Sequence, residues 1–448
     1  MVHKNEAKRV LILGAGFAGL YAARELEKIF AGDKSVEITL VNRDNFFLFT
    51  PMLSEVPSSG IEAKHVISPI RAFLKKVSFK QAEIHSINFA ERIVTCSHCP
   101  KCEIYYLEYD YLVMALGSIT NFYGLPGVSQ NSFPMKTLSD AMALRNHVID
   151  RFEHADMEEH IETRRRLLTF VVVGGGFAGV EVAAELNEFI HVSRKLYRNV
   201  DREDVKVVLV VAGSRIMPEI SENLADYAYN KLLKHRIEFH FQTKLIRASS
   251  NNIELDNGNN FSISTETLIW TAGVSPDPII QSLPCEKDKK GRIITNEYLE
   301  VPGVSNIWAL GDCAHIPDPS TGDSYPPTAQ YAIREGRLAA RNIAAVIQDR
   351  YKDRKCFEYS PAGILVPLGN MTAVAKIKGF RFSGFFAWWL WRTIYLSKLP
   401  GLDRKIRVAI DWTLNLFFTR DIVKLNVFIK PASEKRSLNP ENCDKKNH

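Results

Sequence analysis

Short apolar runs followed by glycines recur along the chain and predict the strand–turn–helix units of an α/β protein. The first apolar run covers residues 10–13, and Gly14, Gly16 and Gly19 follow it in the spacing G-x-G-x-x-G. The stretch LYAARELEKIF then has helical periodicity, and a second apolar run, VEITLV, leads to Asn42. In this arrangement the first glycine permits a tight turn, the second admits a pyrophosphate, and the third lets helix and strand pack closely. The pattern predicts a dinucleotide-binding unit.

The same pattern returns in the middle of the chain. The stretch TFVVVGGGFAGVEVAAELNEF places Gly174, Gly176 and Gly179 between an apolar run and a helical stretch, and the next apolar run ends at Val211. A single glycine fingerprint is weak, but two fingerprints in the same strand–turn–helix context are a strong signal. We therefore expect an α/β fold with two Rossmann-like dinucleotide-binding domains.

A third pattern dominates the C-terminal part of the chain. Residues 382–401 read FSGFFAWWLWRTIYLSKLPG, where Arg392 interrupts an apolar run that is too short to cross a bilayer. In the following stretch, LDRKIRVAIDWTLNLFF, the polar residues Asp403, Arg407, Asp411 and Asn415 recur every fourth position and define one narrow helical stripe. This segment predicts amphipathic helices that lie on a membrane, bury each other, or form a dimer seam.

Charge favours the first of these alternatives. Residues 376–436 contain thirteen Lys or Arg against four Asp or Glu, although the whole chain carries a net charge of only +6. Basic groups that flank apolar bulk suit an anionic lipid surface better than nucleic acid, and a solvated basic face is the plain alternative. We expect a membrane-surface partner and no nucleic acid.

Composition and cysteine usage set the remaining bounds. A chain of 448 residues with 46% hydrophobic and 24% charged positions is expected to be globular and to form two or three domains. Seven cysteines do not suggest a disulfide scaffold, and MVHKNEAKRV lacks the layout of a signal peptide, so a reducing cytoplasm is the expected compartment.

Several motifs together carry a family resemblance. They are GAGFAG, LFTPMLSEV, GGGFAGVE, WTAGV, LGDCA, PPTAQYAIREG and AWWLWRTIYL…LPGLDRKIRVAIDW. The chain resembles the flavin disulfide-reductase fold and, within it, the type II NADH dehydrogenases, which are non-proton-pumping NADH:quinone oxidoreductases. The resemblance implies a discontinuous FAD domain at 8–165 and 286–365, an NAD(P)H domain at 166–285, a membrane-association segment at 366–430 and a disordered polar tail at 431–448.

The resemblance also implies the site residues. Those expected at FAD are Gly14, Gly16, Gly19, Asn42, Arg43, Gly117, Gly311, Asp312, Ala329 and Gln330. Those expected at NAD(P)H are Gly174, Gly176, Gly179, Glu181, Val211 and Gly273. Glu181, Gln330 and Arg334 are the catalytic candidates. Glu181 would relay protons or bind the nicotinamide amide, or would only place negative charge at a helix N-terminus.

Two positions depart from the family pattern. Val211 stands where a carboxylate usually holds ribose hydroxyls, so the choice between NADH and NADPH is open, and Val211 could equally serve only in packing. Arg334 replaces the second glutamine of A-Q-x-A-x-Q, which leaves the quinone open, and it could equally be a solvent-facing helix residue.

The cysteines bear on the type of chemistry. No cysteine pair stands where disulfide reductases carry theirs, so the expected electron path runs from flavin directly to an outside acceptor. A sulfide:quinone oxidoreductase also needs reactive cysteines and is the weaker alternative. Cys96, Cys99 and Cys102 are a weak metal candidate, because one cluster lacks the second pair of a structural zinc site, and we expect no metal.

The combined expectation is an FAD-dependent NAD(P)H:quinone oxidoreductase. Hydride would pass from NAD(P)H to FAD, and two electrons would pass to a membrane quinone without proton pumping. The enzyme would sit peripherally on the cytoplasmic side of the cell membrane, bound to anionic lipids, with a homodimer as an open alternative. A soluble flavoprotein that serves a protein acceptor is the competing function class.

Overall fold

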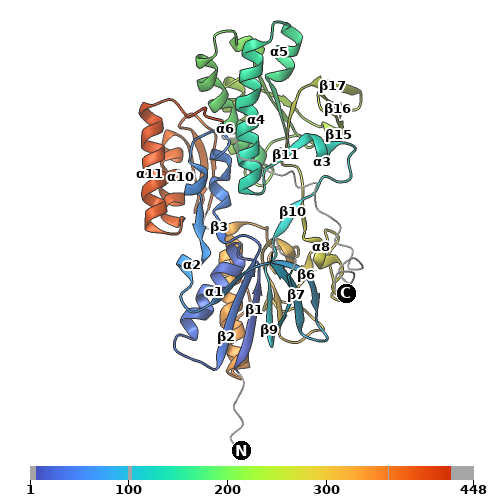
Figure 1. Ribbon diagram of the computed structural model, residues 1–448, viewed down its shortest axis with the longest axis vertical. Coiled ribbons are helices and arrows are strands. Elements are labelled where there is room, and N and C mark those ends of the chain that lie inside the picture. Colours follow the sequence, from blue (N-terminus) through green and yellow to red (C-terminus); the bar gives the residue numbers. More distant parts are fainter. Residues whose placement is uncertain (1–6, 99–102, 362, 425–448) are drawn as a thin grey trace, which may run out of the picture.

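The computed structural model describes residues 7–98, 103–361 and 363–424. Two α/β units are stacked along the long axis, and two C-terminal helices lie against the side of their junction (Figure 1). Both α/β units and the helical C-terminal segment were predicted from the hydrophobic pattern. The tail at 431–448, together with Cys99 and Cys102, lies outside the described residues.

The first unit is built on a five-stranded parallel sheet. Its order is β21 (Ile307–Ala309), β9 (Tyr111–Met114), β1 (Lys8–Leu13), β2 (Val36–Asn42) and β5 (Ser78–Gln81). The edge strand β21 comes from far along the chain and pairs with β9. An antiparallel meander extends the unit and consists of β6 (Glu83–Asn88), β7 (Ile93–His98) and β8 (Glu103–Glu108).

Two long helices of the first unit pack unusually closely. They are α1 (Phe17–Ile29) and α9 (Ala329–Ile347). A Cβ atom added at Gly336 of α9 would lie 2.2 Å from the carbonyl oxygen of Ala18 in α1. Glycine therefore sets the separation of the two helices, because any side chain at this position would push them apart.

The second unit repeats the plan with its own parallel sheet. Its order is β11 (Ser132–Pro134), β18 (Thr267–Trp270), β12 (Thr169–Val173), β13 (Lys206–Val210) and β14 (Ile237–His240). Its helices are α4 (Leu138–Met157), α5 (Ile161–Leu167), α6 (Phe177–Ser193) and α7 (Glu222–Lys234), and its antiparallel meander is β15 (Lys244–Ala248), β16 (Asn252–Asp256) and β17 (Asn260–Ser264).

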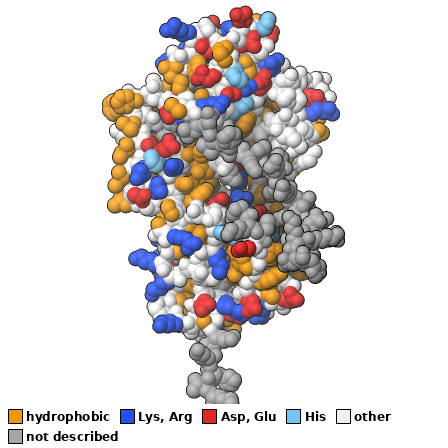
Figure 2. Space-filling model, in the orientation of Figure 1, with side chains coloured by type: hydrophobic (Ala, Val, Ile, Leu, Met, Phe, Trp, Pro, Cys, Tyr) orange, Lys and Arg blue, Asp and Glu red, His pale blue; other side chains and the backbone are white. Residues whose placement is uncertain are grey.

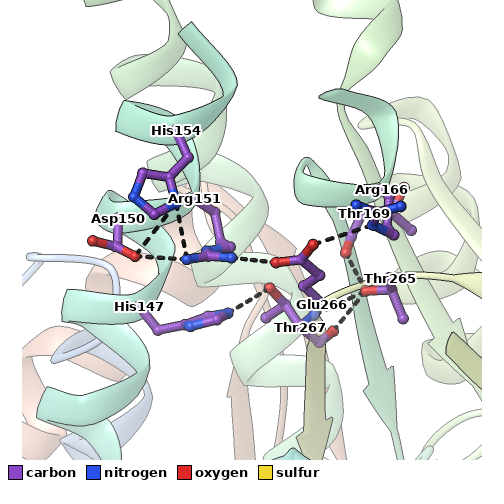
Figure 3. A network of polar contacts seen from close by, with 9 residues as sticks. All are labelled: His147, Asp150, Arg151, His154, Arg166, Thr169, Thr265, Glu266 and Thr267. Carbon is purple, nitrogen blue, oxygen red and sulfur yellow. Dashed lines mark hydrogen bonds and ion pairs between the residues drawn. The ribbon is translucent and has the colours of Figure 1, made fainter. Parts of the chain in front are cut away.

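A polar network fixes α4 and α5 to the start of β18 (Figure 3). The carboxylate of Glu266 accepts hydrogen bonds from both Arg151 on α4 and Arg166 on α5. Beside it, Nε2 of His147 lies 2.9 Å from Oγ1 of Thr267. Burial lowers the pKa of His147 to about 4, so the imidazole is neutral and acts here as a hydrogen-bonding group.

Two short strands pair between the two units, and the remaining short elements are spread over the chain. Strands β10 (Ser118–Thr120) and β19 (Val274–Pro276) pair antiparallel between the units. The others are β3 (Phe46–Leu48), η1 (Thr50–Glu55), η2 (Ala63–His65), β4 (Ile67–Pro69), α2 (Ile70–Phe73), α3 (Val128–Asn131), η3 (Arg194–Leu196), η4 (Arg202–Asp204), α8 (Pro278–Gln281), β20 (Ile293–Ile294), η5 (Gly311–Cys313), β22 (Ala314–His315) and η6 (Tyr351–Asp353).

The C-terminal segment begins with an antiparallel sheet of β23 (Gly363–Pro367), β24 (Ala373–Ile377) and β25 (Phe380–Gly384). Helices α10 (Phe385–Lys398) and α11 (Leu402–Phe417) follow, and they lie side by side on the left of Figure 1. Within the described ranges, no helix combines the length and hydropathy that a bilayer crossing requires.

Helix α11 turns part of its polar stripe toward the protein. Asp411 accepts a hydrogen bond from the backbone N–H of Glu62, and Nδ2 of Asn415 donates to the carbonyl oxygen of Gly60 at 2.8 Å. Asp403 and Arg407, also in the predicted stripe, are exposed. Figure 2 shows an orange column at the left edge of the molecule, where α11 lies in Figure 1. We define the apolar foot as these exposed apolar side chains of α10 and α11: Phe385, Phe386, Trp389, Leu402, Ile406, Ile410, Leu414 and Phe417.

The helix contact at Gly336 generates a stability prediction. Gly336→Ala forces a methyl group against the backbone of α1, and such overpacking should lower the free energy of unfolding by about 3 kcal/mol. Gly213→Ala is the matched control, because a Cβ atom there meets nothing closer than 3.9 Å. Thermal unfolding of both variants checks this, and equal midpoints would contradict the account of the α1–α9 contact.

Candidate active site

The first glycine turn connects β1 to α1 and has the geometry that its spacing predicts. Gly14 has φ +95°, and a Cβ atom there would lie 2.3 Å from the carbonyl oxygen of Ala115. A Cβ atom at Gly19 would lie 1.9 Å from the carbonyl oxygen of Gly14. At Gly16, in contrast, a Cβ atom meets nothing within 4 Å. Two glycines therefore serve backbone packing, and the third leaves space at the N-terminus of α1.

That space opens into a cavity of about 600 Å³ at the carboxyl ends of the first sheet. Seven of the ten residues expected at FAD line it: Gly16, Asn42, Arg43, Gly117, Gly311, Asp312 and Ala329. Gly14 and Gly19 lie behind the turn, as their contacts require, and Gln330 lies outside this lining. Residues that the motifs did not indicate also line the cavity, among them Ser118, Lys136 and Thr137.

Asp312 is held at the cavity wall by two of these additional residues. The Ser118 hydroxyl donates a hydrogen bond of 2.6 Å to the Asp312 carboxylate, and Nζ of Lys136 lies 3.2 Å from the same oxygen. Lys136 reaches the cavity from the residues just before α4, so no local motif marks it. The group places a lysine ammonium and a carboxylate side by side at the wall.

Asn42 supports the glycine turn as well as lining the cavity. Its Oδ1 accepts a hydrogen bond of 2.8 Å from the backbone N–H of Ala15, and its Nδ2 donates to the carbonyl oxygen of Asp44 at 2.7 Å. The amide thus ties the end of β2 to the turn after β1.

Glu335 lies buried beneath the cavity wall. Its Oε2 accepts a hydrogen bond of 2.7 Å from the backbone N–H of Gly311. Burial, opposed by that hydrogen bond, raises the pKa of Glu335 to about 8. The side chain is therefore mostly protonated at neutral pH and adds little negative charge beside Asp312.

The second glycine turn, between β12 and α6, repeats the first. Gly174 has φ +131°, and a Cβ atom at Gly179 would lie 1.8 Å from the carbonyl oxygen of Gly174. Gly176, like Gly16, has open space where a Cβ atom would be. Val211 is 3% exposed, and its side chain would lie 2.5 Å from a Cβ atom at Gly175. Val211 therefore packs against the turn, and it offers no polar group to a ribose.

Gly273 is tightly covered by an aromatic ring. A Cβ atom there would lie 2.6 Å from the ring of Tyr123, a side chain that is itself largely exposed. The Tyr123 hydroxyl donates to the carbonyl oxygen of Ala272 at 3.5 Å. Gly273 thus leaves room for the Tyr123 ring beside the loop that follows β18.

Glu181 lies in the first turns of α6, where three elements of the chain meet. The Ser54 hydroxyl of η1 lies 3.5 Å from its Oε2, and Glu185 and Glu55 are acidic neighbours. Burial and then these two carboxylates raise the pKa of Glu181 to about 8. Burial and the Glu181 carboxylate also raise the pKa of Tyr395 on α10. Glu181 therefore faces η1 and the C-terminal helices.

Gln330 and Arg334 lie on the first turns of α9, at its contact with the C-terminal segment. Nε2 of Gln330 donates to the carbonyl oxygen of Gly363 at 2.9 Å, and its Oε1 accepts from the Tyr359 hydroxyl at 3.2 Å. The Arg334 guanidinium lies 3.8 Å from the centroid of the Tyr359 ring. Burial and the Arg334 charge lower the pKa of Lys398 on α10. Arg334 is thus partly buried toward α10 and is not a plain solvent-facing residue.

The cysteines show no arrangement for thiol chemistry or metal binding within the described ranges. Cys96 is buried in β7, and no group of three His, Cys, Asp or Glu is placed to hold a metal ion in the part of the chain that the structure describes. Cys313 is fully buried beside Asp312, and burial raises its pKa to about 12, so its thiol stays protonated.

Comparison with known proteins accords with this geometry. The pyridine nucleotide-disulphide oxidoreductase family matches residues 8–336, and the NDH2 C-terminal domain matches residues 362–421. The chain is 31% identical to a probable NADH dehydrogenase of Dictyostelium discoideum, covering 93% of this chain and 91% of that protein. It is 30% identical to the type II NADH:quinone oxidoreductase of Mycobacterium tuberculosis, covering 92% and 89%.

Solved structures show the same fold. NDH2 from Plasmodium falciparum in complex with NADH superposes with a TM-score of 0.85 at 21% identity, covering 94% of this chain and 100% of that one. A sulfide:quinone oxidoreductase from Aquifex aeolicus superposes with a TM-score of 0.69 at 16% identity, covering 92% and 96%.

The buried carboxyl at Glu335 generates a prediction for stability against pH. The pKa of Glu335 is about 8 in the folded protein and near 4.5 when the side chain is exposed. Between these pH values Glu335 therefore carries a proton in the folded protein but has lost it in the unfolded chain. Because of Glu335, the free energy of unfolding therefore decreases as the pH rises from about 4.5 to 8. Glu335→Gln keeps an acceptor for Gly311 and should stabilise the protein by roughly 2–4 kcal/mol at pH 8, with little gain at pH 5. Thermal midpoints at both pH values measure this; a gain of the same size at pH 5 would contradict it.

Proposed function

This chain belongs to the pyridine nucleotide-disulphide oxidoreductase family and, within it, to the type II NADH:quinone oxidoreductases, and we propose that it oxidises NADH and reduces a membrane quinone with the help of a bound FAD. The observation that carries the proposal is the convergence of three features. The first unit has an open glycine turn at Gly16, and the second unit has one at Gly176. The third feature is Glu181 of the second unit, which faces the C-terminal helices.

The first cavity fits FAD in shape and in chemistry. The open position at Gly16 leaves room for a pyrophosphate at the N-terminus of α1, where backbone N–H groups point outward. Asp312 and Ser118 offer hydrogen-bonding groups for ribityl hydroxyls, and Lys136 and Arg43 offer positive charge. FAD, when bound, accepts a hydride from NADH and delivers two electrons to quinone. The protein's part is to hold the cofactor and to align both substrates with it.

The second turn suits NADH. Gly176 opens the N-terminus of α6 for the pyrophosphate, as Gly16 does in the first unit. NDH2 from Plasmodium falciparum has been solved in complex with NADH, which supports NADH as the donor here. Because Val211 places no carboxylate at the ribose, we propose that NADPH is excluded less strongly than in enzymes with an acid there.

The quinone site that we propose lies where α9 meets α10. Gln330 and Arg334 come from α9, Tyr359 bridges them, and Tyr395 and Lys398 come from α10. Aromatic rings with a few fixed polar groups suit a quinone head group, which is flat and carries two carbonyl oxygens. Because α10 is also part of the C-terminal segment, this position is next to the apolar foot.

The apolar foot supports attachment to the surface of a membrane. Phe417 is 78% exposed and Leu402 is 73% exposed, which is costly in water. The aromatic and aliphatic side chains of the foot, with Arg381, Lys378 and Arg407 nearby in sequence, suit an interfacial position among anionic headgroups. We propose the cytoplasmic leaflet, where soluble NADH is at hand, and we expect no nucleic acid partner. A homodimer seam is the alternative use of the same face.

Two other functions have less support. Sulfide oxidation needs reactive thiols at the flavin, and Cys313, which adjoins the cavity wall, is buried and protonated. A soluble flavoprotein with a protein acceptor would have to use the apolar foot as a protein-docking face, and the basic residues near the foot in sequence favour an anionic lipid surface instead.

The two glycine turns provide a matched pair of variants. Gly16→Val should fold but fail to bind FAD, because the side chain points into the open space that the pyrophosphate would occupy. Gly176→Val should bind FAD normally and lose NADH oxidation by at least about a hundredfold. Flavin absorbance and NADH oxidation with a short-chain quinone separate the two results. Wild-type protein that takes up no FAD, or that reduces no quinone with NADH, would refute the proposed function.

The apolar foot generates a prediction for membrane binding. The triple variant Ile406→Gln, Ile410→Gln and Leu414→Gln removes apolar contacts worth about 3 kcal/mol, a loss of roughly a hundredfold in affinity for anionic vesicles. The variant should still oxidise NADH with ferricyanide as the electron acceptor, but it should no longer reduce quinone that is held in vesicles. The whole segment is not deleted in this test, because Trp391 and Trp412 are buried in the protein.

A matched triple variant controls for the loss of exposed apolar surface. Met157→Gln, Ile161→Gln and Leu196→Gln alter exposed side chains of the second unit, away from the C-terminal helices. This variant should bind vesicles like the wild type. If both triple variants bind equally, the apolar foot is not the membrane contact.

A further inference from the structure

Two positively charged side chains at the proposed quinone site have no acidic partner. Arg334 lies on the first turns of α9, and Lys398 is the last residue of α10. Among the described residues, neither of them forms an ion pair with an aspartate or a glutamate. Arg420, which follows α11, is different, because it pairs with Glu185 at 3.3 Å. The positive charge at the quinone site is therefore open to a ligand.

Arg334 is held in place by uncharged groups. Its Nη1 donates a hydrogen bond of 2.8 Å to the carbonyl oxygen of Gln330, one helical turn earlier. Its guanidinium lies 3.8 Å from the centroid of the Tyr359 ring, and the Tyr359 hydroxyl donates to Oε1 of Gln330. A guanidinium has five N–H donors, and the hydrogen bond to Gln330 uses one of them. Arg334 is thus oriented, and donors remain for a ligand.

Lys398 adds a second positive charge near the first. Burial and the Arg334 charge lower the pKa of Lys398, so the two cations are close enough to repel each other. Nζ of Lys398 also lies 5.8 Å from the centroid of the Tyr395 ring. Two like charges that lack an acidic partner are unfavourable together, and an anion that binds near both of them offsets their repulsion.

The acids around the site carry little negative charge. Glu181 is the acid whose charge reaches Tyr395. Burial, followed by Glu185 and Glu55, raises the pKa of Glu181 to about 8, so its carboxyl group is mostly uncharged at neutral pH. Glu335, next to Arg334 in the chain, is also mostly protonated, and its side chain binds Gly311. The two cations therefore dominate the charge of the site.

Negative charge can be present on a quinone before any reduction takes place. A quinone with a hydroxyl group beside a ring carbonyl loses the hydroxyl proton in neutral solution, because the charge spreads over the ring oxygens. Such an anion presents planar, charged oxygens, and these suit the fork of a guanidinium. The glutamine that the family pattern has at position 334 would offer hydrogen bonds without charge. Arg334 thus changes which head groups the site favours.

We propose that Arg334, together with Lys398, makes the quinone site select head groups that carry negative charge, and that ring-hydroxylated quinones in their ionised form are the class of ligand it binds best. The proposal rests on the proposed function and adds to it the charge of the preferred ligand. Arg334 is the specificity-determining residue, because it is fixed in place and departs from the family pattern. Lys398 strengthens the same selection from α10.

The test compares two ligands that differ in charge and hardly in shape. Lawsone, a naphthoquinone with one hydroxyl group beside a carbonyl, is an anion at neutral pH, and its methyl ether is neutral. Equilibrium dialysis against the FAD-loaded, full-length protein without NADH measures both dissociation constants and involves no turnover. Wild-type protein should bind lawsone about tenfold more tightly than the methyl ether, and Arg334→Gln should remove most of that difference. Arg334→Lys keeps the charge and should keep most of the preference.

Arg337→Gln is the matched control, because it removes the same charge from an exposed residue of the same helix, whose guanidinium lies over the Tyr21 ring of α1. This variant should bind both ligands like the wild type. If Arg334→Gln does not fold, Lys398→Gln tests the other cation by the same ratio of dissociation constants. A wild-type ratio near one, or an unchanged ratio in a folded variant at either position, would overturn the charge selection. In that case reduction of a neutral short-chain quinone by the wild type with NADH would still uphold the proposed function.

Discussion

The packing of the C-terminal helices against η1 and α6 is the contact on which the rest of the site depends. Trp412 of α11 is buried and donates its indole N–H to Glu55, a residue 357 positions earlier in the chain. Asp411 contacts His65 at 2.5 Å, and Asn415 binds the backbone of Gly60. These polar contacts fix the rotation of α11, and that rotation leaves its apolar residues outside. One packing arrangement therefore partly covers Glu181 and exposes the foot.

The arrangement has two features that lower the stability of the protein in water. Large apolar side chains remain exposed on one side of the C-terminal helices, and an excess of acids is buried on the other. A soluble protein would gain stability by removing either feature. A lipid surface removes the first cost, because it covers the foot. Protonation of Glu55 and Glu181, whose pKa values are raised by burial, reduces the second.

Sequence reasoning was most successful where the constraint is local. The tight turn at Gly14 and the close packing at Gly19 follow from the motif spacing, because adjacent elements decide them, and the structure shows the same geometry at Gly174 and Gly179. The amphipathic pattern of α11 was also visible. Which side of α11 faces the protein was not, because Gly60 and Glu62, its partners, are distant in the sequence.

Residues that reach the site through long-range packing carried no local signal. Lys136 belongs to no pattern that marks a cofactor wall, yet it contacts Asp312. Glu335 lies in the motif PPTAQYAIREG, but the motif does not show that its side chain binds the backbone of Gly311. Glu55 lies in an expected motif, but its burial depends on Trp412. Val211 left two interpretations open, and only its contact with Gly175 shows that it packs against the turn.

The most direct measurement follows NADH, quinol and protons together, with the FAD-loaded protein bound to anionic vesicles that contain a long-chain quinone. The account predicts one quinol formed and one proton taken up from solution for each NADH oxidised. NADH oxidation that produces no quinol in the vesicles, or that begins only when a water-soluble acceptor is added, would contradict the claim that this protein delivers electrons from NADH to a quinone in the membrane.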